Sequence, residues 1–269
     1  MCSPAAPAAG PRHIKILLLK TKLIINADDF GLSDTVNKAI DQCFVAGIIN
    51  STSLMVTTPG FAAAVQLAKQ NGYAHQLGVH VNLTDGKPLT AFSASRFLDE
   101  KGNWNKTMIR KTRVRMAAAE RKSFRDEIAA QVQRAEEAGI IPAHVNSHHH
   151  IHISPVLFTL FFDLCREKKY KLRIAQTHQN GHYIKDTYRR LINYRIRMAG
   201  LAFSDYFETI ETYNKRKKIF KNGTVEIMVH PTLDSRGKLV DDLHRENEGR
   251  EYLEFVDRFS IQATGIQRH

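Results

Sequence analysis

The feature that most constrains the fold of this chain is its regular alternation of strand-like and helix-like segments. Short apolar runs typical of buried strands recur at 23–27, 51–56, 77–83, 143–147, 172–175 and 225–229. Segments with helical periodicity separate them, as in the βα units that build a parallel sheet. With 269 residues and 43% apolar content, the chain can bury a large core. We predict one α/β domain that forms a closed or nearly closed barrel, with an open doubly wound sheet as the alternative.

Local signals predict where several helices lie. Ser33 or the residue after it can cap a helix that ends at Gly47. A helical region is expected within 107–138, with a break near 122–123, and a basic helix is expected over 186–201.

The segment 84–106 lacks periodicity and is longer than an ordinary connection in a compact domain. We expect either a lid that contacts a ligand or a surface excursion without that role. Its aromatic residues Phe92, Phe97 and Trp104 either stack on a ligand or pack the loop against the domain.

The chain carries no evident targeting or membrane segment. Residues 1–20 are expected to form a tail and lead-in, and residues 21–269 the folded domain. The apolar stretch at 14–19 is shorter than the ~7–15 residues of a signal-peptide core. No stretch approaches the roughly 18 consecutive apolar residues that a transmembrane helix requires. We expect a soluble, cytoplasmic protein.

The three cysteines, Cys2, Cys43 and Cys165, are odd in number and widely spaced. This usage favours reduced thiols over a disulfide framework. Cys43 and Cys165 lie in apolar helical patterns, so we expect both to pack in the core.

The formal net charge of +12 is the unusual compositional value. Basic residues gather within 110–125, 189–197 and 215–218. They form solvated helix faces or meet an anionic partner, and no nucleic-acid-binding motif accompanies them. We expect no nucleic-acid partner, and we leave open a weak contact with an anionic membrane surface and a homodimer.

Four predicted strands end in residues that bind metals or move protons: Asp28 and Asp29, His80, His148, and His230. In barrels of βα units, side chains at the carboxyl ends of strands meet at one face of the domain. A single histidine in an apolar stretch is more often a core residue, but packing alone does not readily produce four such strand ends.

Two imidazoles and one carboxylate form a ligand set that suits Zn²⁺, Fe²⁺, Co²⁺ or Mn²⁺, and Mg²⁺ less naturally. A metal-bound water is then an effective nucleophile and a neighbouring carbonyl is polarised, as in amide or ester hydrolysis. Asp28 and Asp29 alternate faces if the strand continues through them. Where the strand begins to turn, one can bind metal while its neighbour reaches the metal-bound water. The alternative is that one aspartate caps a helix or forms a turn.

The cluster from His148 to His152 contains more imidazoles than one site needs. An extended backbone would place His148, His150 and His152 on one side, whereas a helix would pair His148 with His152. One or two of them should touch metal, and the others should line the pocket, orient a ligand or bind sugar hydroxyls. An adventitious histidine-rich patch is the alternative.

At these positions the chain resembles the YdjC-like carbohydrate deacetylases. The resemblance rests on the segments 26–33, 51–56, 78–89, 147–152 and 226–231. It implies a distorted TIM-like (β/α) barrel that removes acetyl groups from N-acetylated sugars, as oligosaccharides or glycolipids that contain N-acetylglucosamine.

The resemblance also implies residue roles. Asp29, His80 and His148 would hold one divalent metal ion. Mg²⁺ and Zn²⁺ are both kept as candidates for that ion. Asp28 would be the general base acting on the metal-bound water, and His230 the general acid for the departing amine.

Substrate contacts are assigned to His150, His152 and Asn82. The chain departs from the family pattern at Asn146, where an aspartate is usual. A neutral side chain there gives weaker electrostatic support to a nearby histidine.

Two other functions remain as alternatives. One is a different metal-dependent amidohydrolase or phosphoesterase on a similar barrel. The other is a basic protein that binds a membrane or RNA and carries a vestigial metal site.

Overall fold

The computed structural model describes residues 21–111, 115–179, 181–220 and 222–242. The predicted tail over 1–20 and Cys2 lie outside this part. The strands are β1 (Lys22–Phe30), β2 (Ser51–Leu54), β3 (Leu77–Val81), β4 (His144–Ser147), β5 (Lys171–Leu172), β6 (Tyr206–Thr209), β7 (Thr224–Val229), β8 (Pro231–Leu233) and β9 (Leu239–Asp241). The α-helices are α1 (Asp34–Val45), α2 (Phe61–Gln70), α3 (Lys106–Ile109), α4 (Ala118–Glu137), α5 (Phe158–Lys168), α6 (Tyr183–Met198) and α7 (Ile210–Arg216). Short 3₁₀ turns lie at Ala74–Gln76, Ser95–Phe97 and His148–Ile153.

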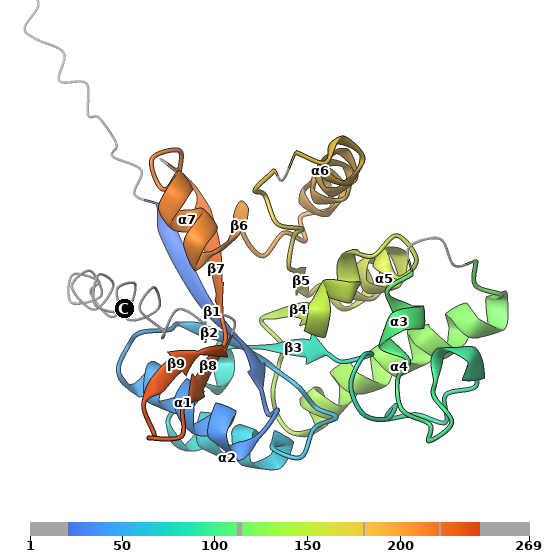
Figure 1. The fold of residues 1–269 in the computed structure, drawn as a ribbon, viewed down its shortest axis with the longest axis horizontal. Helices are drawn as coiled ribbons and strands as arrows, with labels where there is room; N and C mark the ends of the chain where they lie inside the picture. Colours follow the sequence, from blue (N-terminus) through green and yellow to red (C-terminus); the bar gives the residue numbers. More distant parts are fainter. Residues whose placement is uncertain (1–20, 112–114, 180, 221, 243–269) are drawn as a thin grey trace, which may run out of the picture.

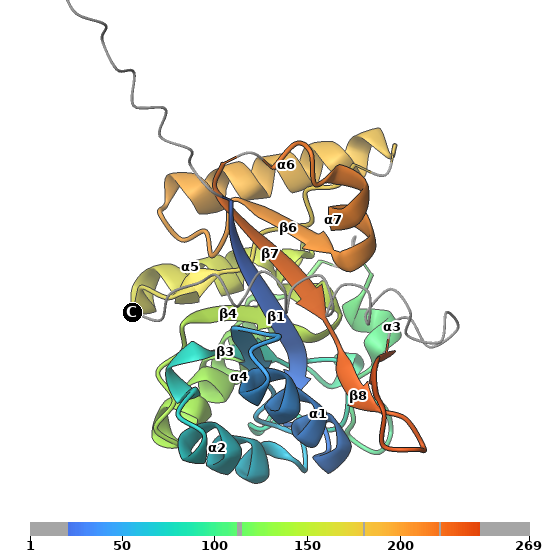
Figure 2. The same cartoon turned by 90° about the vertical axis from the view of Figure 1, so that its left-hand side faces the viewer.

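Seven parallel strands form one curled sheet in the order β5-β4-β3-β2-β1-β7-β6, with helices around it (Figures 1 and 2). This is the strand order of a barrel that stays open between β5 and β6. Backbone bonds bridge that opening, because Leu172 N–H donates to the Leu201 carbonyl and Thr177 N–H donates to the Phe207 carbonyl. The prediction of a single α/β domain with a distorted TIM-like barrel is confirmed.

The first βα unit follows the sequence signals closely. The inner residues of β1, including Ile25 and Ala27, are buried as expected for a strand with partners on both sides. The hydroxyl of Ser33 accepts a hydrogen bond from Val36 N–H and caps α1, as predicted. The edges of the sheet were less visible in the sequence, because β6, α7 and the β8–β9 hairpin were not predicted.

The predicted break in the long helical region was wrong. Helix α4 runs without interruption through Lys122 and Ser123, and the region is interrupted earlier, since α3 ends at Ile109 and α4 begins at Ala118. The Ser123 hydroxyl contacts the Ala119 carbonyl one turn back, so this side chain is accommodated inside the helix.

The prediction that aromatic residues of 84–106 contact a ligand is not supported. Phe97 and Trp104 are buried, and Phe92, Phe97 and Trp104 all have ring contacts with Phe124 of α4. These rings pack the loop against the domain, which was the alternative prediction.

Cys43 and Cys165 lie in the core, as predicted. Burial raises the pKa of the Cys165 thiol to about 12, which makes it unreactive. Within the described ranges, none of the helices combines the length and the apolar character needed to cross a bilayer.

Candidate metal centre

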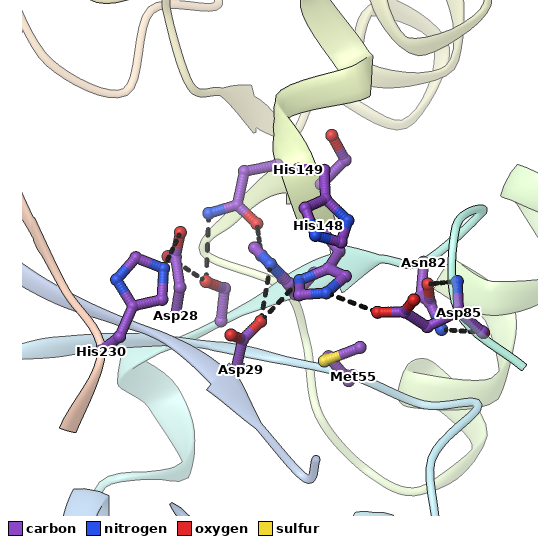
Figure 3. Close-up of polar contacts among 12 residues, drawn as sticks. Asp28, Asp29, Met55, Asn82, Asp85, His148, His149 and His230 are labelled. Atoms are coloured by element: carbon purple, nitrogen blue, oxygen red, sulfur yellow. Dashed lines mark hydrogen bonds and ion pairs between the residues drawn. The ribbon is translucent and has the colours of Figure 1, made fainter. Parts of the chain in front are cut away.

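The end of β1 separates the two adjacent aspartates. The register between β1 and β2 shifts between Ala27 and Phe30, and Asp29 has a φ of 70°. A left-handed backbone costs a non-glycine residue about 1–2 kcal/mol and takes Asp29 out of the strict alternation of a strand. Both carboxylates therefore reach the group of side chains in Figure 3.

Glycine is required at the next turn position. Gly31 has a φ of 97°, and a Cβ on it would lie 2.6 Å from the carbonyl oxygen of Met55. The Asp-Asp-Phe-Gly order thus has a steric basis, because only glycine lets the chain leave β1 so close to β2.

The three predicted metal ligands converge on one point. Asp29 Oδ1 lies 2.8 Å from His148 Nδ1 (Figure 3) and 3.2 Å from His80 Nε2. These residues come from β1, β3 and the turn that follows β4, and their ligand atoms are close enough to hold one metal ion together. Asp29 Oδ1 is buried and forms no hydrogen bond of ordinary geometry.

The outer nitrogen of His80 fixes which nitrogen faces the centre. His80 Nδ1 lies 2.6 Å from Asn146 Oδ1, while Asn146 Nδ2 donates to Ser53 Oγ. The Asn146 oxygen is therefore the acceptor, and His80 Nδ1 carries the proton. His80 Nε2, which lies 3.2 Å from Asp29 Oδ1, is the nitrogen that can bind a metal ion. The histidine that Asn146 supports is thus His80.

His148 is oriented in the same way by a carboxylate. Its Nε2 lies 2.8 Å from Asp85 Oδ2, which can only accept when ionised, so the proton of a neutral His148 stays on Nε2 and Nδ1 is the nitrogen available to a metal ion. Burial lowers the pKa of His148, but the contacts with Asp29 and Asp85 raise it above its ordinary value overall.

These donors fit a divalent cation. Burial alone would raise the pKa of Asp29, but the two imidazoles hold it well below its ordinary value, so the carboxylate is ionised. Positive charge shared with the imidazoles stabilises this ionised carboxylate, and a divalent cation would take the place of that charge, with the carboxylate oxygen and the two inner imidazole nitrogens as its ligands.

Asp28 belongs to a buried charge cluster beside this centre. Arg173 donates to both Asp28 oxygens at 2.7 Å and, through Nε, to Glu226 Oε1 at 2.7 Å. Asp28 Oδ1 also accepts from Asn26 and Ser53. Each of the three charged side chains is at most 1% exposed.

The two carboxylates of this cluster have opposite pKa shifts. Burial works against ionised Asp28, but Arg173 and nearby histidines outweigh it and hold the pKa of Asp28 well below its ordinary value. Burial and the charge of Asp28 raise the pKa of Glu226 to about 7, although Arg173 opposes the rise. Asp28 is therefore ionised throughout the working range, whereas Glu226 titrates near neutrality.

His230 lies on the other side of Asp28. Its Nε2 is 4.0 Å from Asp28 Oδ2, and its backbone N–H donates to Asp241 Oδ2. Since Oδ2 accepts one charged hydrogen bond and Oδ1 accepts three, the open side of the carboxylate is the one toward His230.

The histidine cluster follows neither an extended strand nor a regular helix, because the 3₁₀ turn that contains it is kinked at two residues. His149 and His150 both have a φ of 54°, so consecutive side chains point in different directions. His148 alone joins Asp29 and His80. His149 contacts Thr84 and Lys106 through its two ring nitrogens, and His152 is buried against Ser147.

A cavity of about 790 Å³ lies beside the centre. His149 and His150, which directly follow His148, line it together with apolar residues and the cationic side chains of Arg110, Lys185 and Arg189. Burial, followed by the charge of Arg173, lowers the pKa of His150 to about 3, so its imidazole is neutral.

The predicted substrate residue Asn82 is fully buried, and its amide is used within its own loop. Its Oδ1 accepts from Thr84 N–H and Asp85 N–H, and its Nδ2 donates to Thr57 Oγ1 and the Asp85 carbonyl. These bonds hold the turn that presents Asp85 to His148.

Arg173 and Glu226 are the site residues that sequence reasoning missed. Both interrupt apolar strand patterns, at 172–175 and 225–229. A charged residue in a buried strand is almost always paired, so two of them with opposite charge could have predicted the ion pair.

The fold and the site together define a class: a TIM-like α/β domain with a candidate Asp-His-His metal centre at the carboxyl ends of its strands. A family model described as YdjC-like protein matches residues 22–256. The chain belongs to this family.

Several relatives have a named activity. The chain is 35% identical over 152 residues to a carbohydrate deacetylase of Clostridium beijerinckii, covering 56% of this chain and 59% of that protein. It is 37% identical over 153 residues to a chitooligosaccharide deacetylase of Yersinia enterocolitica, covering 56% and 58%. These matches span less than two thirds of each relative. A longer match is with a carbohydrate deacetylase of Halalkalibacterium halodurans. It is 32% identical over 214 residues and covers 78% of this chain and 84% of that protein.

A solved structure shares the fold. A crystal structure from Enterococcus faecalis, provisionally assigned to cellobiose-phosphate cleavage, superposes with a TM-score of 0.66 at 26% identity. The match covers 81% of this chain and 83% of the other.

Proposed function

We propose that this protein is a metal-dependent hydrolase that removes the acetyl group from N-acetylglucosamine units of an oligosaccharide or glycolipid. The observation that carries the proposal is the convergence of Asp29 Oδ1, His80 Nε2 and His148 Nδ1, each imidazole having its other nitrogen held by an acceptor. The names of the relatives in the same family support the choice of an acetylated carbohydrate.

Asp29, His80 and His148 are the residues we assign to hold the ion, for which Zn²⁺ suits the nitrogen donors better than Mg²⁺. When bound, a divalent ion supplies a Lewis acid that polarises an acetamide carbonyl and makes water more acidic. Asn146 and Asp85 keep the two imidazoles in the tautomers that face the ion.

Proton transfer falls to Asp28 and His230 in this proposal. Asp28 is ionised, and its Oδ2 accepts the proton as water attacks the acetyl carbon. His230 donates a proton to the sugar nitrogen as the C–N bond breaks, which releases acetate and a free amine. The grip of Arg173 limits the basicity of Asp28 but fixes the position of its oxygens.

The cavity beside the centre is the place we assign to the rest of the substrate. His150 is neutral there and can bind sugar hydroxyls. We assign Asn82 and His152 to positioning roles, because both are buried and bonded within the protein. The cationic residues Arg110, Lys185 and Arg189 favour a substrate with an anionic group.

The test of this function is acetate release from a panel of N-acetylglucosamine compounds. Neutral and phosphorylated disaccharides and a lipid-linked N-acetylglucosamine should be compared, with and without a chelator. We expect acetate release that the chelator abolishes and added Zn²⁺ restores. Release that is unaffected by the chelator, or hydrolysis of phosphate esters without acetate release, would overturn the proposal.

The role of Asp28 is tested by Asp28→Asn. We expect turnover to fall by a factor on the order of 10² to 10⁴ while metal remains bound. The matched control is Asp163→Asn on α5, a half-buried aspartate outside the cluster whose ion-pair partner is Arg166, and it should keep full turnover. Near-normal turnover in Asp28→Asn, with metal content measured, would remove this residue from the role of base.

A further inference from the structure

Helix α6 carries apolar side chains on the side that faces away from the core. Tyr183, Ile184, Leu191, Tyr194 and Met198 are between 57% and 85% exposed. At 3.6 residues per turn these five positions fall within an arc of about 100° on the helix surface. We call them the α6 outer stripe. Figures 1 and 2 both place α6 at the edge of the molecule.

The opposite side of α6 is fixed to the domain. Ile192 and Ile196 are buried in the core, and the Asn193 amide exchanges two hydrogen bonds with the backbone of Ala175. The helix already has a complete inner face, so its orientation is set and the outer stripe is an additional apolar surface. Such a surface on a folded domain indicates a contact with something else.

Exposed cations flank the outer stripe. Arg190 and Arg197 lie along one side of it and Arg195 along the other, as their spacing on the helix requires. The Arg195 guanidinium stacks on Phe158 and Phe162, and Arg197 donates to the Asp205 carbonyl. Of these three cations, Arg190 is therefore the one without a contact to another element in the described part of the chain. The acidic residue within α6, Asp186, is 6% exposed. The exposed surface of the helix therefore combines a central apolar stripe with positive edges.

We propose that the α6 outer stripe docks on an anionic lipid surface. Apolar side chains flanked by arginines are the pattern of helices that lie in the plane of a membrane interface. The tyrosines can sit at headgroup level, while the arginines reach anionic phosphates. A second copy of this chain is a poor partner, since a two-fold contact would bring the same arginines together. A nucleic acid would leave the apolar stripe without a partner.

Docking would also place the cavity beside the lipid surface. Ile184, Lys185, Tyr188 and Arg189 of α6 line that cavity. The same helix thus forms part of the cavity wall and carries the proposed membrane contact. This inference does not depend on the proposed chemistry, and its test measures no hydrolysis.

The experiment is co-sedimentation of the full chain with phosphatidylcholine vesicles that contain or lack phosphatidylglycerol. We expect binding to the anionic vesicles alone, weakened by added salt because charge attraction contributes. The double variant Leu191→Ser/Tyr194→Ser should bind at least on the order of tenfold more weakly. Arg190→Glu should also reduce binding.

The matched control is Val45→Ser/Ile141→Ser, which removes apolar side chains that are 72% and 78% exposed elsewhere on the molecule. It should bind like the wild type. A second readout is the fluorescence of Tyr194→Trp, which should shift to the blue on anionic vesicles, whereas Ile141→Trp should not shift.

Several outcomes would overturn the proposal. The proposal fails if the wild type does not bind anionic vesicles, or if Val45→Ser/Ile141→Ser loses as much vesicle binding as the stripe variant. It also fails if the fluorescence of Tyr194→Trp does not shift. A dimer in solution that Leu191→Ser/Tyr194→Ser dissociates would assign the stripe to a second copy. RNA binding lost in that variant, without vesicle binding, would assign it to nucleic acid.

Discussion

Glu226 and Asp28 share one buried guanidinium, that of Arg173. Two carboxylates and one arginine leave one negative charge too many, and burial raises the pKa of Glu226 from 4.5 to about 7. Glu226→Gln mimics the protonated form. We predict that its free energy of unfolding increases relative to that of the wild type as the pH rises. A pKa rise of this size corresponds to ~3 kcal/mol of destabilisation once the folded protein ionises.

The direction of this pH dependence follows from how many protons the folded and unfolded chains bind. Between pH 4.5 and about 7 the folded protein holds a proton on Glu226 that the unfolded chain has lost. Unfolding then releases a proton, so this group makes the wild type less stable as the pH rises through that window. Glutamine cannot titrate, and the variant lacks this contribution.

The assay is urea unfolding of both proteins, with chelator present, at several pH values from 4 to 8. The fluorescence of Trp104 reports the transition, because this tryptophan is 5% exposed in the folded protein. The free energy of unfolding of Glu226→Gln should gain ~3 kcal/mol relative to the wild type across this range. Stability curves that stay parallel would refute the raised pKa and the charge balance from which it follows.

Three further predictions concern the scaffold and the ligands. Arg173→Met leaves its two carboxylate partners without a countercharge and should cost about 3–5 kcal/mol in urea unfolding; unchanged stability would mean that the cluster is not buried. Gly78→Ala would place a Cβ 2.4 Å from the His144 ring and should destabilise by at least about 1–3 kcal/mol, so a neutral result in the same assay would contradict the packing. Asp85→Asn removes the carboxylate that orients His148 and should weaken Zn²⁺ binding roughly 10- to 100-fold in calorimetric titration, and unaltered affinity would exclude this role.

The parallel sheet was predictable because its inner strands are continuous apolar runs. The edge was not, since β6 is four residues long and contains the buried carboxyl of Glu208, which breaks the apolar pattern. The break before α4 was misplaced because Ser123, a residue type favoured at helix N-caps and turns, donates back to a carbonyl of its own helix.

The candidate ligands were predictable because each one ends a strand or directly follows one. The histidine segment was not, because two successive left-handed residues, His149 and His150, follow neither helical nor strand periodicity. Arg173 was missed because its partners are 53 and 145 residues away, a separation at which no local pattern connects them.

The central claim is that Asp29, His80 and His148 hold one divalent ion. The most direct measurement is calorimetric titration of the metal-free wild type and of Asp29→Asn with Zn²⁺. We predict that the wild type binds one ion per chain and that Asp29→Asn binds it more than ~100-fold more weakly. This loss should exceed the one expected for Asp85→Asn, because Asp29 would bind the ion directly. Equal affinity in the two proteins, or no binding in the wild type, would contradict the account.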